Sequence, residues 1–143
     1  MREKILSLLG MMRRANAIAL GEDKTGEAVR AGKGRLLLLA SDASDNARRR
    51  AESFASGRSV LLVPLPFTKE ELSDAVGAGG CSMAAVTDLG FANAWMKLMK
   101  EQWPEEYGAL AEAVESRHEK AIRRKAGKAQ AGNKSSGKRR TNV

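Results

Sequence analysis

Apolar residues recur at intervals of three and four near the start of the chain, at Ile5, Leu8, Leu9 and Met12. This spacing places them on one face of a helix and predicts a helix over about residues 2–14. The short apolar stretch at residues 17–20 then predicts a brief strand, which Gly21 ends.

A run of four leucines at residues 36–39 is bounded by basic and polar residues. It predicts a strand buried on both faces, so helices must cover both faces. The preceding segment predicts a helix that starts with Glu22 and Asp23, whose charge suits a helix N-terminus, and ends at Gly32. Gly26 lies inside that helix at a cost of about 1 kcal/mol relative to alanine, so another property of the fold must justify it.

Helical and strand patterns then alternate, as helix 44–56, strand 59–63, helix 68–76, strand 82–87 and helix 88–100. Thr68 and Glu71 form a capping-box sequence, which defines one helix start. Strands that alternate with helices predict an α/β fold arranged as a three-layer α/β/α sandwich. We expect this core domain to occupy residues 1–101.

The composition changes after the core domain. Pro104 suits the first position of a new helix. Apolar residues recur along that helix at Tyr107, Leu110 and Val114. We therefore expect a helical extension over residues 102–125, acidic at first and then basic. Residues 126–143 lack apolar periodicity and predict a basic tail that is disordered in the free protein.

The chain carries 25 Lys and Arg against 17 Asp and Glu, a formal net charge of +8 that favours a polyanionic partner. Residues 1–100 hold 15 basic and 11 acidic groups, residues 101–116 hold five acids and no base, and residues 117–143 hold ten bases and one acid. The last bases are Lys128, Lys134, Lys138, Arg139 and Arg140. This tail suits non-specific attraction to phosphates that weakens as salt rises.

A single cysteine, Cys81, cannot form an internal disulfide, and no Cys/His spacing suggests a metal site, so we expect a cytoplasmic protein without metal or cofactor. A nucleophilic Cys81 would need a nearby base. The only histidine, His118, lies in the charged C-terminal helix and is expected at the surface, so a structural thiol is favoured. The first helix is too short and too charged for a signal peptide, and no apolar run reaches the roughly 18 residues of a membrane span.

Two glycine patterns resemble phosphate-binding loops. A Walker loop needs G-x-x-x-x-G-K-S/T, whereas Gly26 is followed by Glu27, which supplies neither the lysine nor the hydroxyl. Glycines also precede the strand expected at residues 82–87, the reverse of the order in a dinucleotide-binding loop. A helix cap explains the first of them, but Gly79 and Gly80 exceed what a cap needs, so a ligand-binding loop stays open as an alternative to a flexible turn.

Positive charge gathers around the second expected helix and the turn that follows it, at Lys24, Arg30, Lys33 and Arg35. The backbone N–H groups at the start of that helix are also available to phosphates. The three arginines at residues 48–50 instead point about 100° apart on their helix. They favour a solvated outer face over a nucleic-acid contact.

Three segments together resemble a known family. They are LLGMMRRANAIALGED near the start, VRAGKGRLLLLASDASDNARRR in the middle and AVTDLGFA at residues 85–92. They are similar to the kink-turn RNA-binding superfamily that contains ribosomal proteins seven-Ae and thirty-e, and most similar to the small bacterial YlxQ-type proteins. The resemblance spans about residues 3–95. It implies a four-stranded mixed sheet between helices, no catalysis, and binding of structured RNA by the second helix start and the loop before the last strand.

The family's RNA motif, G-x-N-E-x-x-K, falls on Gly21, Asp23, Lys24 and Glu27, and only the glycine is matched. In the family the asparagine and glutamate contact guanines of sheared G·A pairs. Asp23 can still accept hydrogen bonds from a guanine edge, and Lys24 can donate to O6 or N7. The family's second contact, a loop that packs on a flipped-out base, falls on residues 77–83, which offer little stacking surface.

These observations predict a non-enzymatic protein that binds structured, kink-turn-like RNA as a ribosomal or ribosome-associated component. The expected partner is ribosomal RNA, and no membrane or small-molecule substrate is expected. The alternative is a protein-interaction module whose basic tail alone attracts RNA. The predicted RNA-binding residues are Gly21, Glu22, Asp23, Lys24, Glu27, Arg30, Lys33, Arg35, Gly79, Gly80, Cys81 and Ser82.

Overall fold

The computed structural model describes the backbone of residues 1–136 and the side chains of residues 1–127. The strands are β1 (Ile18–Leu20), β2 (Leu36–Leu39), β3 (Leu61–Pro64) and β4 (Met83–Val86). The helices are α1 (Arg2–Arg14), α2 (Glu22–Arg30), α3 (Asp45–Ala55), α4 (Lys69–Val76), α5 (Leu89–Gln102) and α6 (Pro104–Ser136). The strands form one sheet in the order β1-β4-β2-β3. Because β2 and β3 are parallel while β4 is antiparallel to β1 and β2, the sheet is mixed as predicted.

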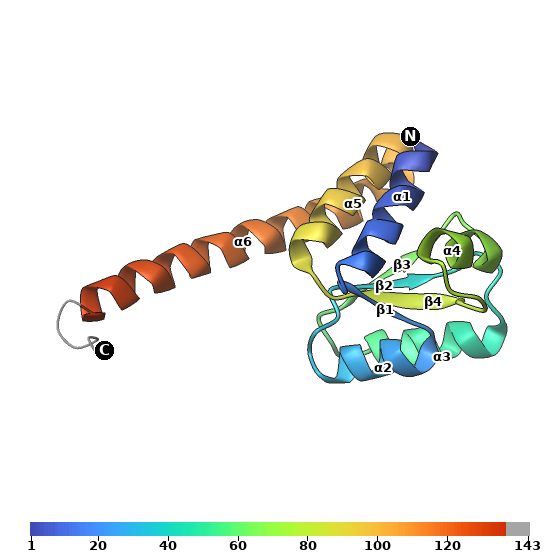
Figure 1. Ribbon diagram of the computed structural model, residues 1–143, viewed down its shortest axis with the longest axis horizontal. Coiled ribbons are helices and arrows are strands. Elements are labelled where there is room, and N and C mark those ends of the chain that lie inside the picture. Colours follow the sequence, from blue (N-terminus) through green and yellow to red (C-terminus); the bar gives the residue numbers. More distant parts are fainter. Residues whose placement is uncertain (137–143) are drawn as a thin grey trace.

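Helices cover both faces of the sheet (Figure 1), with α2 and α3 on one side and α1, α4 and α5 on the other. The leucines of β2 alternate between these two layers. Leu36 and Leu38 pack in the core with α1 and α5, whereas Leu37 and Leu39 pack with α2 and α3. All four are at most 3% exposed. The predicted three-layer α/β/α sandwich with a doubly buried strand is therefore confirmed.

Side-chain caps mark three of the predicted helix starts. The Oγ of Ser44 accepts from the Ala47 N–H at 3.1 Å, and the Thr68 capping box is complete. The carboxylate of Asp88 accepts from the Phe91 N–H at 2.8 Å. Each cap satisfies a backbone donor that has no partner within the helix.

The packing of α2 against α3 explains the glycine at position 26, which the sequence alone does not explain. A Cβ at this position would lie 2.8 Å from Cζ of Phe54, which α3 presents to α2. Contacts under 3.0 Å force a neighbour to move, so glycine allows the two helices to approach closely. Two guanidinium groups lie over the ring of Phe54. The Cζ atoms of Arg30 and Arg50 are 5.9 Å and 5.5 Å from the ring centroid.

The C-terminal helix α6 folds back along α5 and then extends beyond the sheet (Figure 1). Tyr107, Ala111 and Val114 are buried in the core, and the Tyr107 hydroxyl donates to the Pro64 carbonyl at 2.6 Å. These contacts agree with the apolar spacing expected for this helix.

One expectation about the C-terminal region stays a prediction and another needs correction. The described backbone of α6 continues to Ser136, and residues 137–143 lie outside the described residues, so the expected disorder of residues 126–143 stays a prediction. His118 is half-buried rather than fully exposed, because its Nδ1 lies 3.1 Å from Nδ2 of Asn93 on α5. The division of the chain at residues 101 and 125 stays a prediction. No helix among residues 1–136 combines the length and apolar character needed to cross a membrane.

Candidate nucleic-acid interface

The first turn of α2 begins at a glycine with an unusual backbone conformation. Gly21 has φ of 88° and ψ of 167°, and its carbonyl accepts from the Thr25 N–H at 3.0 Å. Glycine has no side chain to cap the helix, so the first-turn N–H groups receive no side-chain acceptor from the N-cap residue. Free N–H groups and the helix dipole make such an end suitable for an anion.

The loop between α4 and β4, residues 77–82, is held against this helix start. Gly77 ends α4 in the left-handed conformation, and the Cys81 N–H donates to the Ser73 hydroxyl at 2.9 Å. The Cys81 thiol then donates to the Met83 carbonyl at 3.2 Å. The Gly21 N–H donates to the same carbonyl at 3.0 Å. The structure therefore brings together the two segments that the sequence could relate only through the family resemblance.

Cys81 supports this junction from within the core. Its side chain is buried, and burial raises the pKa of the thiol above its ordinary value, so the thiol stays protonated and able to donate at neutral pH. A buried, protonated thiol agrees with the structural role that the sequence favours for Cys81 over a nucleophilic role. Gly79 and Gly80 are exposed and Ser82 is half-buried, so these three, rather than the Cys81 side chain, form the outer surface of the loop.

Three side chains of α2 point to solvent beside this junction: Asp23, Lys24 and Glu27. Glu22 is more constrained, because its carboxylate lies 3.0 Å from Nε of Arg50 on α3. This half-exposed ion pair contributes little stability but offsets one of the acidic groups at the helix start.

Several polar residues near the α2 start were missed as site residues. Asn46, Arg49 and Arg50 of α3 line a hollow together with Glu22. Lys24 borders another hollow, which also contains Arg13 at the end of α1. The sequence favours a solvated face for the arginines at residues 48–50, because helical spacing alone does not show that α3 lies beside α2.

The remaining predicted residues lie elsewhere. The Arg35 N–H donates to the Val86 carbonyl at 2.7 Å, whereas Gly21 is bonded to Met83 at the opposite end of β4. Arg30 closes α2, and Lys33 follows it in the turn that leads to Arg35. The twelve predicted residues therefore form two groups, and the basic turn belongs to the end of the sheet away from the α2 start.

No cluster of three or more His, Cys, Asp or Glu side chains suited to a metal ion occurs within the part of the chain that is described. The geometry of the α2 start offers hydrogen-bond donors, acceptors and one ammonium group. It can bind a polar or anionic ligand.

Known proteins resemble this chain in sequence and in structure. No family model matches the chain. RNA-binding protein YlxQ of Bacillus subtilis (strain 168) is 32% identical over 96 residues, which cover 64% of this chain and 91% of the relative. RNA-binding protein YlxQ of Enterococcus faecium is 27% identical over 99 residues, 69% of this chain and 94% of the relative.

Solved structures agree with this likeness. A protein of unknown function from Bacillus halodurans C superposes with a TM-score of 0.62 at 27% identity, over 68% of this chain and 97% of the other. The Giardia lamblia 15.5kD RNA binding protein superposes with a TM-score of 0.56 at 20% identity, over 79% and 88%, and shares the fold. On the identity and coverage of its curated relatives, this chain belongs to the YlxQ family.

Proposed function

We propose that this protein binds RNA without catalysing a reaction, and that it docks the first turn of α2 and the loop of residues 77–82 on a folded, kink-turn-like RNA. The observation that carries the proposal is the junction at Met83, whose carbonyl accepts both the Gly21 N–H and the Cys81 thiol. The names of the two YlxQ relatives support RNA as the ligand. Ribosomal RNA in the cytoplasm is the partner we expect.

The chemistry at the α2 start suits guanine as well as phosphate. Asp23 is exposed and accepts hydrogen bonds, as the N1–H and N2–H₂ donors of a guanine require, while the ammonium of Lys24 donates to acceptors such as O6 and N7. Glu27 lies one turn further along the same helix. Its negative charge opposes a phosphate there, so the proposed guanine contacts involve Asp23 and Lys24.

The glycines of the loop support close approach by a ligand. A Cβ at Gly79 would meet no atom within 4 Å, and Gly79 has no positive φ. The fold therefore does not require glycine at this position. A bare backbone there would allow a ribose or phosphate to approach the loop directly.

A binding assay with matched variants tests the proposal. We expect the wild type to bind a kink-turn RNA more tightly than a plain duplex of the same length in a gel shift. The double substitution Asp23→Ala and Lys24→Ala should remove most of this preference. The control is Glu3→Ala with Lys4→Ala, which removes the same two charges from exposed positions in the first turn of α1. Equal affinity of the wild type for both RNAs would refute specific recognition.

A second candidate is a protein-interaction module in which only the basic tail attracts RNA. It is favoured by the five bases and the absence of any acid at residues 126–143. A chain ending at residue 125 separates the two candidates. The first predicts that the preference for kink-turn RNA is retained, and the second predicts that RNA binding is lost.

A further inference from the structure

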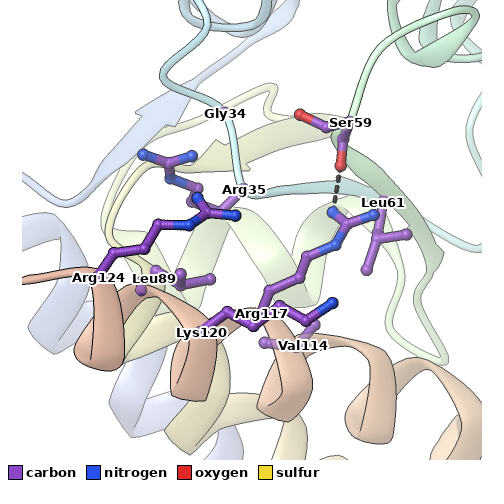
Figure 2. Close-up of a pocket in the computed structure, with 10 residues that line it drawn as sticks. Gly34, Arg35, Ser59, Leu61, Leu89, Val114, Arg117, Lys120 and Arg124 are labelled. Atoms are coloured by element: carbon purple, nitrogen blue, oxygen red, sulfur yellow. Dashed lines mark hydrogen bonds between the residues drawn. The ribbon is translucent and has the colours of Figure 1, made fainter. Parts of the chain in front are cut away.

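A cleft lies between α6 and the end of the sheet that is remote from the α2 start. Its volume is about 400 Å³. Figure 2 shows the residues that line it. Four cationic side chains line it: Arg35, just before β2, and Arg117, Lys120 and Arg124 of α6. The α6 residues recur at intervals of three and four, so one face of the helix presents all three to the cleft.

Among the described residues, no acidic side chain lines the cleft. The other members of the lining are Gly34, Ser59, Leu61, Leu89, Val114 and Ala121. No ion pair involves Arg35, Lys120 or Arg124 within the described residues. The apolar members of the lining are Leu61, Leu89, Val114 and Ala121, and the four cationic residues are exposed.

Arg117 is fixed in place by the main chain. Its guanidinium donates to the Ser59 carbonyl, as the dashed line in Figure 2 shows. This bond links α6 to the segment before β3. Arg35 and Arg124 extend toward the same space in the figure. Three of the cations lie on one face of α6 and the fourth, Arg35, lies just before β2, so the cleft combines cations from two separate parts of the chain.

The positive surface continues past the cleft. A second hollow shares Gly34 and Ser59 with it and is bordered by Arg30 and Arg58. Both of these arginines are exposed. An extended anion could therefore follow a path from α6 across the start of β2 to the end of α2.

We propose that this cleft is a second phosphate-binding site, which holds the sugar-phosphate backbone of the bound RNA. The identity of the ligand rests on the proposed function, whereas the preference for phosphate rests on the four cations. The described residues that line the cleft include no aromatic ring for base stacking and no carboxylate for base reading, so the cleft suits the backbone rather than the bases.

The two sites are close enough for one RNA to occupy both. They lie at opposite ends of β4, whose four residues place its first and last Cα atoms roughly 10 Å apart. Base contacts at the α2 start would then provide specificity, and phosphate contacts at the cleft would provide affinity.

The test compares two pairs of substitutions on α6. Lys120→Gln with Arg124→Gln removes two cations from the cleft. Arg123→Gln with Lys125→Gln removes two exposed cations from the same stretch outside the cleft. Arg117 is left unchanged because of its bond to Ser59. Dissociation constants for a kink-turn RNA and a plain duplex are measured by fluorescence anisotropy over a series of KCl concentrations.

We expect the cleft pair to reduce the slope of log affinity against log salt by about 1.4 to 1.8, which is two phosphate contacts at 0.7 to 0.9 each. The reduction should be equal for both RNAs, and the control pair should cause less than half of it. Arg35→Gln, on a different element, should reduce the slope by about 0.7 to 0.9. Circular dichroism of each variant confirms that it is folded.

The outcomes separate the cleft from the proposed α2 interface. If the cleft pair and the control pair reduce the slope equally, the cleft is not a site and the inference is wrong, whatever the wild-type preference. If the wild type binds both RNAs equally but the cleft pair alone reduces the slope, the cleft stands and specific recognition at α2 fails.

Discussion

Substitution of Gly26 by alanine tests the packing of α2 against α3. Alanine favours an exposed helix interior over glycine by about 1 kcal/mol, so helix propensity alone predicts stabilisation. The added methyl would lie 2.8 Å from Cζ and 3.0 Å from Cε1 of Phe54, which is too close for a carbon contact. Overpacking of this kind costs about 1–3 kcal/mol. We expect a net loss of about 0–2 kcal/mol in the free energy of unfolding.

A double-mutant cycle isolates the cause. Phe54→Leu removes both ring atoms that the new methyl would meet, so Gly26→Ala should become stabilising by about 1 kcal/mol in that background. Urea denaturation followed by circular dichroism gives the four free energies. A third contact, 3.0 Å from the Arg30 guanidinium, involves the far end of a flexible side chain and adds little to the expected cost.

The result that would refute this reasoning is stabilisation by Gly26→Ala in the wild-type background. It would mean that Phe54 moves aside without cost and that close approach of the helices does not require glycine. A coupling energy near zero between positions 26 and 54 would lead to the same conclusion. A destabilised Gly26→Ala with coupling of about 1–3 kcal/mol would support the packing reason.

Three further predictions concern single sites. Gly21→Ala should destabilise the protein by about 1–3 kcal/mol in urea denaturation, because φ of 88° strains any side chain even though no atom lies within 4 Å of the added Cβ; an unchanged midpoint would contradict this. Burial raises the pKa of the Cys81 thiol in the folded state, so the protonated thiol contributes fully to the free energy of unfolding below the unfolded pKa of about 8.5. This contribution is lost as pH rises through the folded pKa. Cys81→Ala should therefore remove this decline in stability between neutral and alkaline pH. Burial is the main cause that raises the pKa of Tyr107, the only tyrosine, to about 12, so ultraviolet titration should show ionisation well above the usual value of about 10. A normal midpoint would show that the ring is not buried. Tyr107→Phe should lower the free energy of unfolding by about 1 kcal/mol through the lost hydrogen bond to Pro64.

The elements of the core were predictable because their signals are local. The apolar period of the first helix, the leucine run at residues 36–39 and the capping box at Thr68 each depend on neighbours within a few residues. Boundaries shifted by only a few residues: β3 starts at Leu61 rather than residue 59, and α5 continues to Gln102. Helix ends fray, so small differences of this kind are expected.

The candidate site was less predictable because it depends on which segments meet. Lys24 and Arg35 appear in one basic stretch of sequence, yet the antiparallel partners of β4 place them at opposite ends of that strand. Arg35 instead shares a cleft with Arg124, far away in the sequence. The spacing of residues along the chain does not show that Arg35 and Arg124 lie close together in space.

The amino-acid sequence by itself determined the alternation of helices and strands, the doubly buried β2 and the glycine that starts α2. Each is set by local periodicity or by a backbone conformation that few residues adopt. Only the tertiary structure decided that Gly21 and Cys81 share the Met83 carbonyl and that α6 brings its cations to Arg35. Such contacts follow from strand order and helix packing, which arise from long-range burial rather than from any short stretch of residues.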